Sequence, residues 1–298
     1  MTRFLKDSPE LLEKLAQVDI VYTDLDGTLL GRGGTLLIDG EGNPDFNTAA
    51  TVVAANKAGL PIVPVTGRSC AQLTEITRMC GWTDYIAEAG AIRSYFDGKE
   101  RTFMFDIPEW NSDLKRQLIT KTPIEIIREH GVVERLMEAF PGCIEYHTPW
   151  DVHRDATEVL RGFLNRQAAL ELLDEIDLPL SLIDNGVIHP RLHTLKASDE
   201  PIRAYHLTPA GVSKRRAIAL DLEYRGIDPS RAIMIGDAPS DMLCAEVVSA
   251  SILVENALRS PGIDKRIDNI ENTAIVEGFA GDGWSRVINE VLSNFSSK

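Results

Sequence analysis

Short apolar runs alternate with amphipathic stretches over residues 1–91. Each run is brief and bounded by turn residues, which is typical of buried strands of a parallel sheet. The segments between them repeat apolar positions at helical spacing, and Gly59 follows one of these segments as a helix C-cap. Pro64 lies inside the second run and removes a ladder hydrogen bond, which argues against a central strand there. The expected strands lie at residues 19–22 and 60–65, with a third strand and its exit within 85–91, and the expected helices lie at 48–58 and 69–80.

The pattern changes between residues 92 and 205. Thr122 and Glu125 are spaced as a capping box, with Pro123 at the first helical position. Asn185-Gly186 separates two short apolar runs and predicts a tight hairpin turn, hence a partly antiparallel sheet. This stretch therefore reads as a separate α/β module.

Strand and helix signals alternate again from residue 206 to the end of the chain. A helix is expected over 213–225 with Gly226 behind it, then strands at 231–235 and 251–254 and a last helix at 284–292. The predicted fold is α/β, with a doubly wound parallel sheet as its core. We expect one core domain formed by residues 1–91 and 206–298, interrupted by an α/β cap domain at 92–205.

Charge and composition narrow the possible partners. The chain has 31 basic and 45 acidic residues, so its formal charge is −14, which disfavours nucleic acid and anionic membranes. No stretch approaches the about 18 apolar residues of a membrane span, and the N-terminal segment lacks the apolar core of a signal peptide. The cysteines show no paired spacing, which favours reduced thiols and a cytoplasmic location. They are Cys70, Cys80, Cys143 and Cys244.

Polar residues follow several of the expected strands at the point where each strand ends. They are Asp24 and Asp26 after 19–22, Thr66, Gly67 and Arg68 after 60–65, and Asp237 and Asp241 after 231–235. Lys214 lies at the start of a helix, just behind the N-cap candidate Ser213. Because ligands of doubly wound sheets bind beyond the carboxyl ends of the strands, we expect these groups to converge. Carboxylate oxygens suit Mg²⁺, and a lysine, a hydroxyl and helix-start N–H groups suit a phosphate.

Each of these features has a simpler interpretation when it is taken alone. Asp24 and Asp26 could form an ordinary Asp-Gly turn, and Lys214 could be a solvated surface lysine. A calcium loop starting at Asp24 fails, because its fifth, sixth and twelfth positions are Thr28, Leu29 and Thr35. The shared placement of all these groups at strand ends favours one common site.

Taken together, the motifs resemble those of the haloacid dehalogenase (HAD) superfamily. The matching segments are Asp24-Leu25-Asp26-Gly27-Thr28, Thr66-Gly67-Arg68, Lys214 within Gly-Val-Ser-Lys, and Gly236-Asp237-Ala238-Pro239-Ser240-Asp241. The spacing is similar to that of the Cof-like phosphatase branch, which includes the sucrose-phosphate, mannosyl-3-phosphoglycerate and trehalose-phosphate phosphatases. In that branch an α/β cap lies between the second and third motifs, where residues 92–205 lie here.

The resemblance implies a role for each matched residue. Asp24 would be the nucleophile that forms an aspartyl-phosphate, and Asp26 would be the general acid and base. Mg²⁺ would be held by Asp24, Asp26 through its carbonyl, and Asp237, with Asp241 supporting them. The phosphate would be bound by Gly27, Thr66, Gly67, Arg68 and Lys214.

The sequence departs from the family pattern at two positions. Ala89 stands in Glu88-Ala89-Gly90, where the branch usually has Asn, which removes an amide from the face between core, cap and substrate. Ser240 stands where many members have Asn, and we expect it to act as a helix N-cap.

The cap is expected to select the substrate, and its Arg, His and Trp side chains suit a phosphosugar. The candidate substrate residues are Arg154, Asn185 and His189. The leading hypothesis is a Mg²⁺-dependent phosphatase that acts on a small phosphorylated metabolite, such as a sugar phosphate. The alternatives are a phosphomannomutase-like phosphosugar mutase and a catalytically silent binding module on the same fold. The silent module is disfavoured because all five key residues are intact: Asp24, Asp26, Lys214, Asp237 and Asp241.

Overall fold

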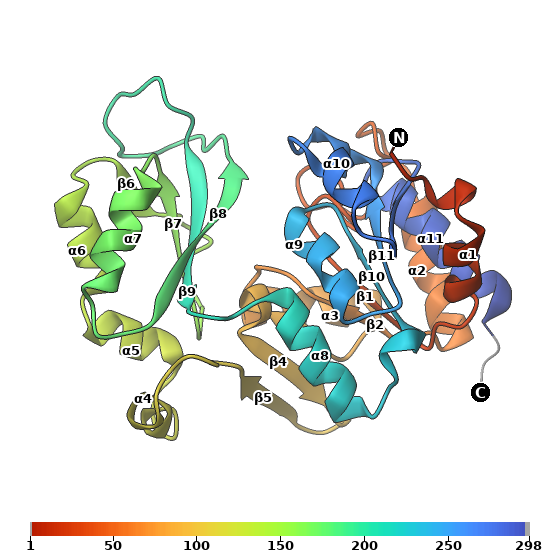
Figure 1. Cartoon of the computed structure of the whole chain (residues 1–298), viewed down its shortest axis with the longest axis horizontal. Coiled ribbons are helices and arrows are strands. Elements are labelled where there is room, and N and C mark those ends of the chain that lie inside the picture. The colour runs from red at the N-terminus through yellow and green to blue at the C-terminus, as the bar shows by residue number, and fades with distance from the viewer. Residues whose placement is uncertain (1, 296–298) are drawn as a thin grey trace. The chain divides into compact units, whose positions relative to one another are not determined.

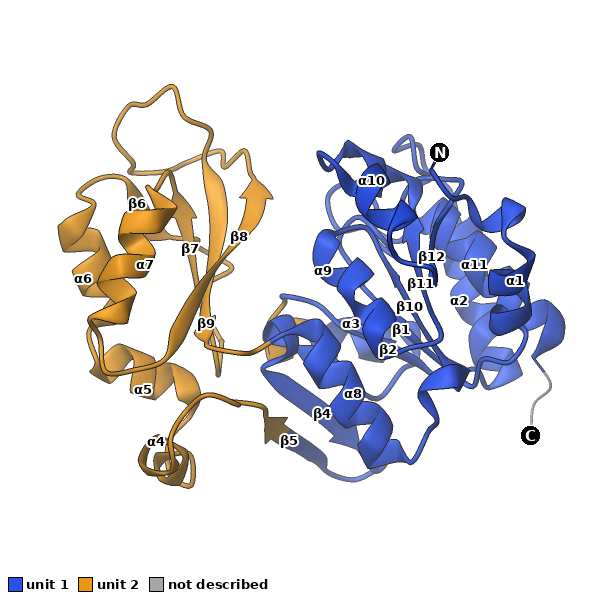
Figure 2. Cartoon of the chain, viewed as in Figure 1, with its two compact units in different colours: residues 1–67, 73–103, 213–298 blue, residues 68–72, 104–212 orange. Residues whose placement is uncertain are grey.

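The structure is a computed structural model that describes residues 2–295. It forms two compact units, shown in different colours in Figure 2. Unit 1 comprises residues 1–67, 73–103 and 213–298, and unit 2 comprises residues 68–72 and 104–212. Compared with the boundaries expected from the sequence, unit 1 extends past residue 91, because the chain continues there into strands that pair with β3 (Tyr85–Ala87).

Unit 1 is built on a five-stranded parallel sheet with the strand order β12-β11-β10-β1-β2 (Figure 1). Every residue of these strands is buried, as expected for a parallel sheet covered on both faces. Pro64 ends β2, which is the last strand in the order, so its missing N–H interrupts no central ladder. The strands are β1 (Ile20–Thr23), β2 (Ile62–Pro64), β10 (Ala232–Gly236), β11 (Ala250–Val254) and β12 (Thr273–Val276).

Helices cover both faces of this sheet. Neighbouring residues of β1 point to opposite faces. Tyr22 donates a hydrogen bond to Asp221 of α8, while Thr23 accepts one from Trp284 of α11, so these two helices lie on opposite faces (Figure 1). The sequence prediction of a doubly wound α/β core is confirmed. The helices of unit 1 are α1 (Pro9–Leu15), α2 (Asn47–Ala58), α8 (Lys214–Arg225), α9 (Pro239–Met242), α10 (Ile263–Asp268) and α11 (Gly281–Asn294), and α3 (Cys70–Cys80) begins in unit 2 and continues in unit 1.

A second, smaller sheet joins β3 to β4 (Ile92–Phe96) and β5 (Arg101–Phe105). A 3₁₀ turn, η2 (Glu88–Gly90), connects β3 with β4. This turn packs against the start of α8 and is therefore part of the surroundings of Lys214.

Unit 2 packs helices against an antiparallel sheet with the order β6-β7-β9-β8. The capping box at Thr122 is confirmed: Glu125 donates its backbone N–H to Thr122 Oγ1 and accepts the Thr122 N–H at 2.7 Å. The strands are β6 (Ile144–Tyr146), β7 (Glu158–Gly162), β8 (Leu180–Val187) and β9 (Arg203–Pro209), and the helices are α4 (Ser112–Gln117), α5 (Pro123–Glu129), α6 (Val132–Ala139) and α7 (Arg166–Asp174).

The predicted hairpin turn at Asn185-Gly186 is wrong. Strand β8 runs through both residues to Val187 and pairs with β9 across the longer connection 188–202. The register shifts between Asp184 and Val187, and the Gly186 N–H donates to the Asp184 carboxylate at 2.9 Å. Gly186 has φ +96°, so the glycine serves a bulge within the strand instead of a chain reversal.

Within residues 2–295, no helix is long and apolar enough to cross a membrane. Among the described residues, Cys70, Cys80, Cys143 and Cys244 form no disulfide, and Cys70, Cys80 and Cys244 are buried.

Candidate functional site

Three carboxylates of unit 1 converge at the carboxyl edge of the large sheet. Asp24 directly follows β1, and Asp237 directly follows β10, the strand that pairs with β1. Asp241 lies one helical turn further, in α9. One oxygen from each carboxylate lies within 4.8 Å of one oxygen of the others. The alternation of buried strands and short turns therefore brings together three of the acidic residues expected from the sequence.

Lys214 joins two of these carboxylates. Its Nζ lies 2.8 Å from Asp24 Oδ1 and 2.7 Å from Asp241 Oδ1. The lysine is the first residue of α8, whose N-cap Ser213 accepts the Arg216 N–H, so the helix begins where the ammonium is needed. Burial alone would lower the pKa of Lys214, but the two carboxylates raise it above its usual value. The lysine therefore stays charged.

Both carboxylate oxygens of Asp241 have polar partners. Oδ1 pairs with Lys214, while Oδ2 accepts the backbone N–H groups of Asp237 and Ala238 at 3.1 and 3.0 Å. The carboxylate is fully buried, and a Cβ at Gly236 would lie only 2.2–2.4 Å from it. Asp241 thus shapes the turn that presents Asp237.

The expectation that Ser240 caps this helix is wrong. Ala238 occupies the N-cap position and Pro239 is the first helical residue, so Ser240 lies inside α9. The Asp241 carboxylate accepts the N-cap N–H in place of a short polar side chain.

The electrostatics of the cluster favour a bound cation. Burial, followed by the charges of neighbouring aspartates, raises the pKa of Asp237 to about 8, and Lys214 only partly offsets this. Burial also raises the pKa of Asp24 to about 6, against the lowering effect of Lys214. Three carboxylates face one ammonium, so ionisation of all three would leave an excess of negative charge that a bound cation could balance. Taking such charge out of water is costly unless it is compensated.

Buried hydrogen bonds hold β1 from both faces just before Asp24. Tyr22 and Tyr95 each donate to a different oxygen of Asp221 at 2.7 Å, and Asp221 is 1% exposed. On the other face, Trp284 donates to Thr23 Oγ1 at 3.0 Å. The strand end that carries Asp24 is therefore fixed to helices α8 and α11. Asp221 lies two turns along α8 from Lys214, so one helix contacts β1 at both points.

The remaining predicted core residues occupy the loops after β1 and β2. Asp26 is exposed, and its charge raises the pKa of Asp24 slightly. Thr66 is 3% exposed and follows β2, beside the end of β1, because Thr23 pairs with Pro64. Gly67 follows Thr66, and Arg68 begins the short segment that belongs to unit 2. Gly27 has φ +83°, and a Cβ there would lie 2.4 Å from Asp237 Oδ2, so only glycine fits.

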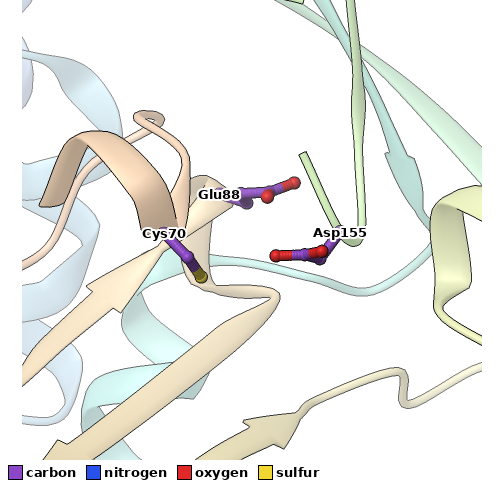
Figure 3. Close-up of side chains that lie close together, drawn as sticks. All are labelled: Cys70, Glu88 and Asp155. Atoms are coloured by element: carbon purple, nitrogen blue, oxygen red, sulfur yellow. The ribbon is translucent and has the colours of Figure 1, made fainter. Parts of the chain in front are cut away.

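The turn after β3 has an unusual backbone. Glu88, Ala89 and Gly90 have φ values of 51°, 61° and 108°. Figure 3 shows Glu88 in this turn and Cys70 at the start of α3. A Cβ at Gly90 would lie 2.4 Å from the Ser213 carbonyl oxygen and 3.1 Å from the Lys214 nitrogen. The turn therefore supports the start of α8. Asparagine tolerates this left-handed backbone better than Ala89 does.

Replacing Gly90 with alanine is expected to lower the free energy of unfolding by about 2–4 kcal/mol and to reduce activity, since the new methyl group would displace the Ser213–Lys214 backbone. The matched variant is Ala89→Gly, which relieves left-handed strain at the neighbouring position. We expect it to raise the free energy of unfolding by about 0.5–1 kcal/mol. Chemical denaturation measures the free energy of unfolding of both variants. Equal stabilities of Gly90→Ala and Ala89→Gly would contradict these expectations.

The proposed substrate residues lie in unit 2. Arg154 is 6% exposed, and its guanidinium donates to the Thr157 backbone and hydroxyl and to the Trp150 carbonyl. Asn185 and His189 are exposed, in the bulge of β8 and in the segment that follows it. Their roles stay predictions.

Asn256 was not among the expected site residues. It is the second residue after β11 and lies in the 3₁₀ turn η5 (Glu255–Arg259). Its amide donates to Asp237 Oδ2 and to the Gly27 carbonyl, both at 2.9 Å. Like the predicted site residues, Asn256 is a polar residue at the carboxyl end of a parallel strand, so the same reasoning could have identified it. No comparable sequence signal marks the hydrogen bonds of Tyr22 and Tyr95 to Asp221, because both tyrosines are far from Asp221 in the sequence.

Comparisons with known proteins find similar phosphatases. The chain is 22% identical to a phosphoglycolate phosphatase from Methanothrix thermoacetophila over 267 residues, which cover 88% of this chain and 94% of that protein. No protein-family model matches the chain.

Two solved structures share its architecture. The sucrose-phosphatase from Synechocystis sp. PCC6803, in complex with sucrose and phosphate, matches with a TM-score of 0.57 and 14% identity, over 92% of this chain and 98% of that one. BT1666 from Bacteroides thetaiotaomicron, a phosphatase of the HAD superfamily, matches with a TM-score of 0.55 and 17% identity, over 93% and 96%. The chain therefore has the fold of HAD phosphatases, and its similar proteins are enzymes of that class.

Proposed function

We propose that this protein is a Mg²⁺-dependent phosphatase that hydrolyses a small phosphomonoester, specifically a sugar phosphate, through an aspartyl-phosphate on Asp24. The observation that carries the proposal is the buried cluster in which Lys214 lies 2.8 Å from Asp24 beside Asp237 and Asp241. A carboxylate nucleophile, a fixed ammonium and an oxygen-rich cation site are the groups that phosphoryl transfer requires.

The donor set fits Mg²⁺. It offers only oxygen ligands, and its excess of negative charge is what a divalent cation neutralises. Asp24 and Asp237 would hold the ion together with the Asp26 carbonyl, while Asp241, whose oxygens are both engaged, supports Asp237. When bound, Mg²⁺ would supply the positive charge that lets an anionic carboxylate approach an anionic phosphate.

The residues of the chain would act in two steps. First, an Asp24 oxygen attacks phosphorus, the ester P–O bond breaks, and Asp26 gives its proton to the leaving alkoxide. Then Asp26 takes a proton from water, which attacks the aspartyl-phosphate and releases phosphate. Lys214, already held against Asp24, would bind a non-bridging oxygen and stabilise the charge of the transition state. Thr66 and Gly67 would donate to the other oxygens.

The similar proteins support the class of substrate. One acts on phosphoglycolate and another on a sucrose phosphate, judging by their names, and both substrates are small phosphomonoesters. A panel of sugar phosphates and phosphoglycolate, assayed for released phosphate with Mg²⁺, tests the proposal. Sugar phosphates are expected to be the better substrates. Interconversion of glucose 1-phosphate and glucose 6-phosphate without phosphate release would instead identify a mutase.

The raised pKa values predict how Mg²⁺ affects stability. The folded pKa values of Asp24 and Asp237, about 6 and about 8, lie above their ordinary value of 3.8. Their contribution to stability is therefore full at low pH and lost as the pH rises through 6 to 8. In a chelator, we expect the free energy of unfolding to fall by about 2 kcal/mol or more between pH 5.5 and 8.

Saturating Mg²⁺ is expected to restore this loss, so the rise in melting temperature on adding Mg²⁺ should be larger at pH 8 than at pH 5.5. Differential scanning calorimetry at both pH values measures it. A shift that is equal at both, or larger at pH 5.5, would contradict the charge state assigned to the cluster.

A further inference from the structure

Asn256 connects the two loops that carry the proposed cation ligands. Its Nδ2 lies 2.9 Å from Asp237 Oδ2, in the loop after β10, and 2.9 Å from the Gly27 carbonyl, in the loop after β1. Asn256 itself comes from a third strand end, after β11. One amide group thus ties together neighbouring strand ends at the edge where the carboxylates converge.

The orientation of this amide is determined by its partners. Asn256 Oδ1 accepts the Ala280 backbone N–H at 2.9 Å, and a backbone N–H can only donate. The NH₂ group must therefore face Asp237 and Gly27, which offer only acceptors here. Ala280 holds an unfavourable backbone conformation, with φ 46° and ψ −126°, and it is 8% exposed. All three contacts select the same orientation of the amide.

The contacts leave one oxygen of Asp237 open. Oδ2 receives the Asn256 hydrogen bond and packs against Gly27, where a Cβ would approach it to 2.4 Å. From the residues that the structure describes, Oδ1 receives only a long contact of 3.4 Å from the Thr28 hydroxyl. Holding the Gly27 carbonyl also anchors the loop after β1, in which the Gly27 N–H donates to the Leu30 carbonyl at 2.9 Å and so fixes the peptide that carries the Asp26 carbonyl.

We infer that Asn256 is a positioning residue that directs Asp237 Oδ1 and the Asp26 carbonyl toward a divalent cation. The inference rests on the function proposed above. Asn256 needs no contact with the substrate or with the reacting atoms in this role. Hydrogen-bond partners of metal ligands commonly change metal affinity by about 10–100-fold, because they set the orientation of the ligand.

The test is calorimetric titration of the full chain with Mg²⁺ alone, without substrate. Asn256→Ala is expected to weaken Mg²⁺ binding by about 10–100-fold relative to the natural sequence. Asn272→Ala is the matched control: Asn272 is also partly buried in unit 1, and its amide donates to the Ala245, Val248 and Ser249 carbonyls away from the carboxylates. It should lower the melting temperature and leave the Mg²⁺ affinity within about twofold.

Mg²⁺ affinity of Asn256→Ala equal to that of the natural sequence would overturn the inference, even if the variant melts at a lower temperature. Should Asn256→Ala not fold, Asn256→Ser, which also cannot span to both acceptors, is measured against the same expectation. If the unchanged protein neither binds Mg²⁺ nor releases phosphate, the proposed function fails and the inference fails with it. If it does both and the Asn256 variants bind Mg²⁺ equally well, only the inference fails.

Discussion

Replacing Asp24 with asparagine is expected to reduce phosphate release by about 10⁴-fold or more, while the protein stays folded. The amide has nearly the same shape as the carboxylate, but it cannot attack phosphorus or carry a negative charge. Asp24 directly follows β1, whose Tyr22 and Thr23 are held by helices on opposite faces, so the fold does not depend on the charge of Asp24 alone. Steady-state kinetics on the best substrate of the panel measures the effect.

Asp19→Asn is the matched control for this variant. Asp19 directly precedes the other end of the same strand, where its carboxylate accepts hydrogen bonds from Arg231. We expect Asp19→Asn to leave the turnover number unchanged, because Asp19 lies at the opposite end of β1 from Asp24. Turnover at the natural rate in Asp24→Asn would exclude Asp24 as the nucleophile.

Replacing Lys214 with methionine is expected to reduce both activity and stability. Its effect on activity is expected to be the largest after that of Asp24→Asn. The side chain of Lys214 is 11% exposed and pairs with Asp24 and with the fully buried Asp241. Removing one partner of a buried ion pair leaves uncompensated charge and costs about 3–5 kcal/mol at neutral pH. Methionine has a similar volume to lysine, so the loss of stability reflects the missing charge more than a change in packing. Activity should fall because the phosphate loses its fixed ammonium.

The pH dependence separates this effect from a loss of packing. At pH 5 the Asp24 carboxyl, whose pKa burial raises to about 6, can take up a proton, so the destabilisation by Lys214→Met should be smaller than at pH 8. Lys121→Met is the control, because Lys121 and Glu129 form an exposed ion pair with side chains 37% and 52% exposed. It should shift the unfolding midpoint little. Destabilisation by Lys214→Met that is equal at both pH values would contradict the assigned charges.

The core of the fold was predictable because its signals are local. Each parallel strand is a short, wholly buried apolar run, and the polar groups of the site directly follow such runs. Asp24 and Asp237 meet because the carboxyl ends of paired parallel strands share one edge. The helix ends predicted from glycine C-caps are also confirmed: Gly59 and Gly226 end their helices with left-handed φ values of 73° and 65°.

The predictions that failed depended on a local signal that a wider context overrode. Asn185-Gly186 has the composition of a hairpin turn, yet pairing with β9 continues past it, and the flexible pair is used for a bulge. Ser240 has the composition of a cap, but Pro239 starts the helix one residue earlier.

The network that holds β1 had no local signal at all. Tyr22 and Asp221 are 199 residues apart in the sequence, and within an apolar run Tyr22 reads as another core residue. Its hydroxyl finds a partner only when α8 packs on the sheet. Asn256 could have been selected, since it follows a buried strand, but its role depends on contacts with Gly27 and Ala280 that only the folded chain provides.

The most direct test of the proposed chemistry is the dependence of phosphate release on Mg²⁺. The unchanged protein is assayed with its best substrate in Mg²⁺, then with excess chelator, and again after Mg²⁺ is restored. Because Asp24 and Asp237 carry charge that Lys214 alone does not balance, we expect release to fall to background in the chelator and to recover fully with Mg²⁺. Turnover that continues unchanged in the chelator would contradict a Mg²⁺-dependent mechanism at this site.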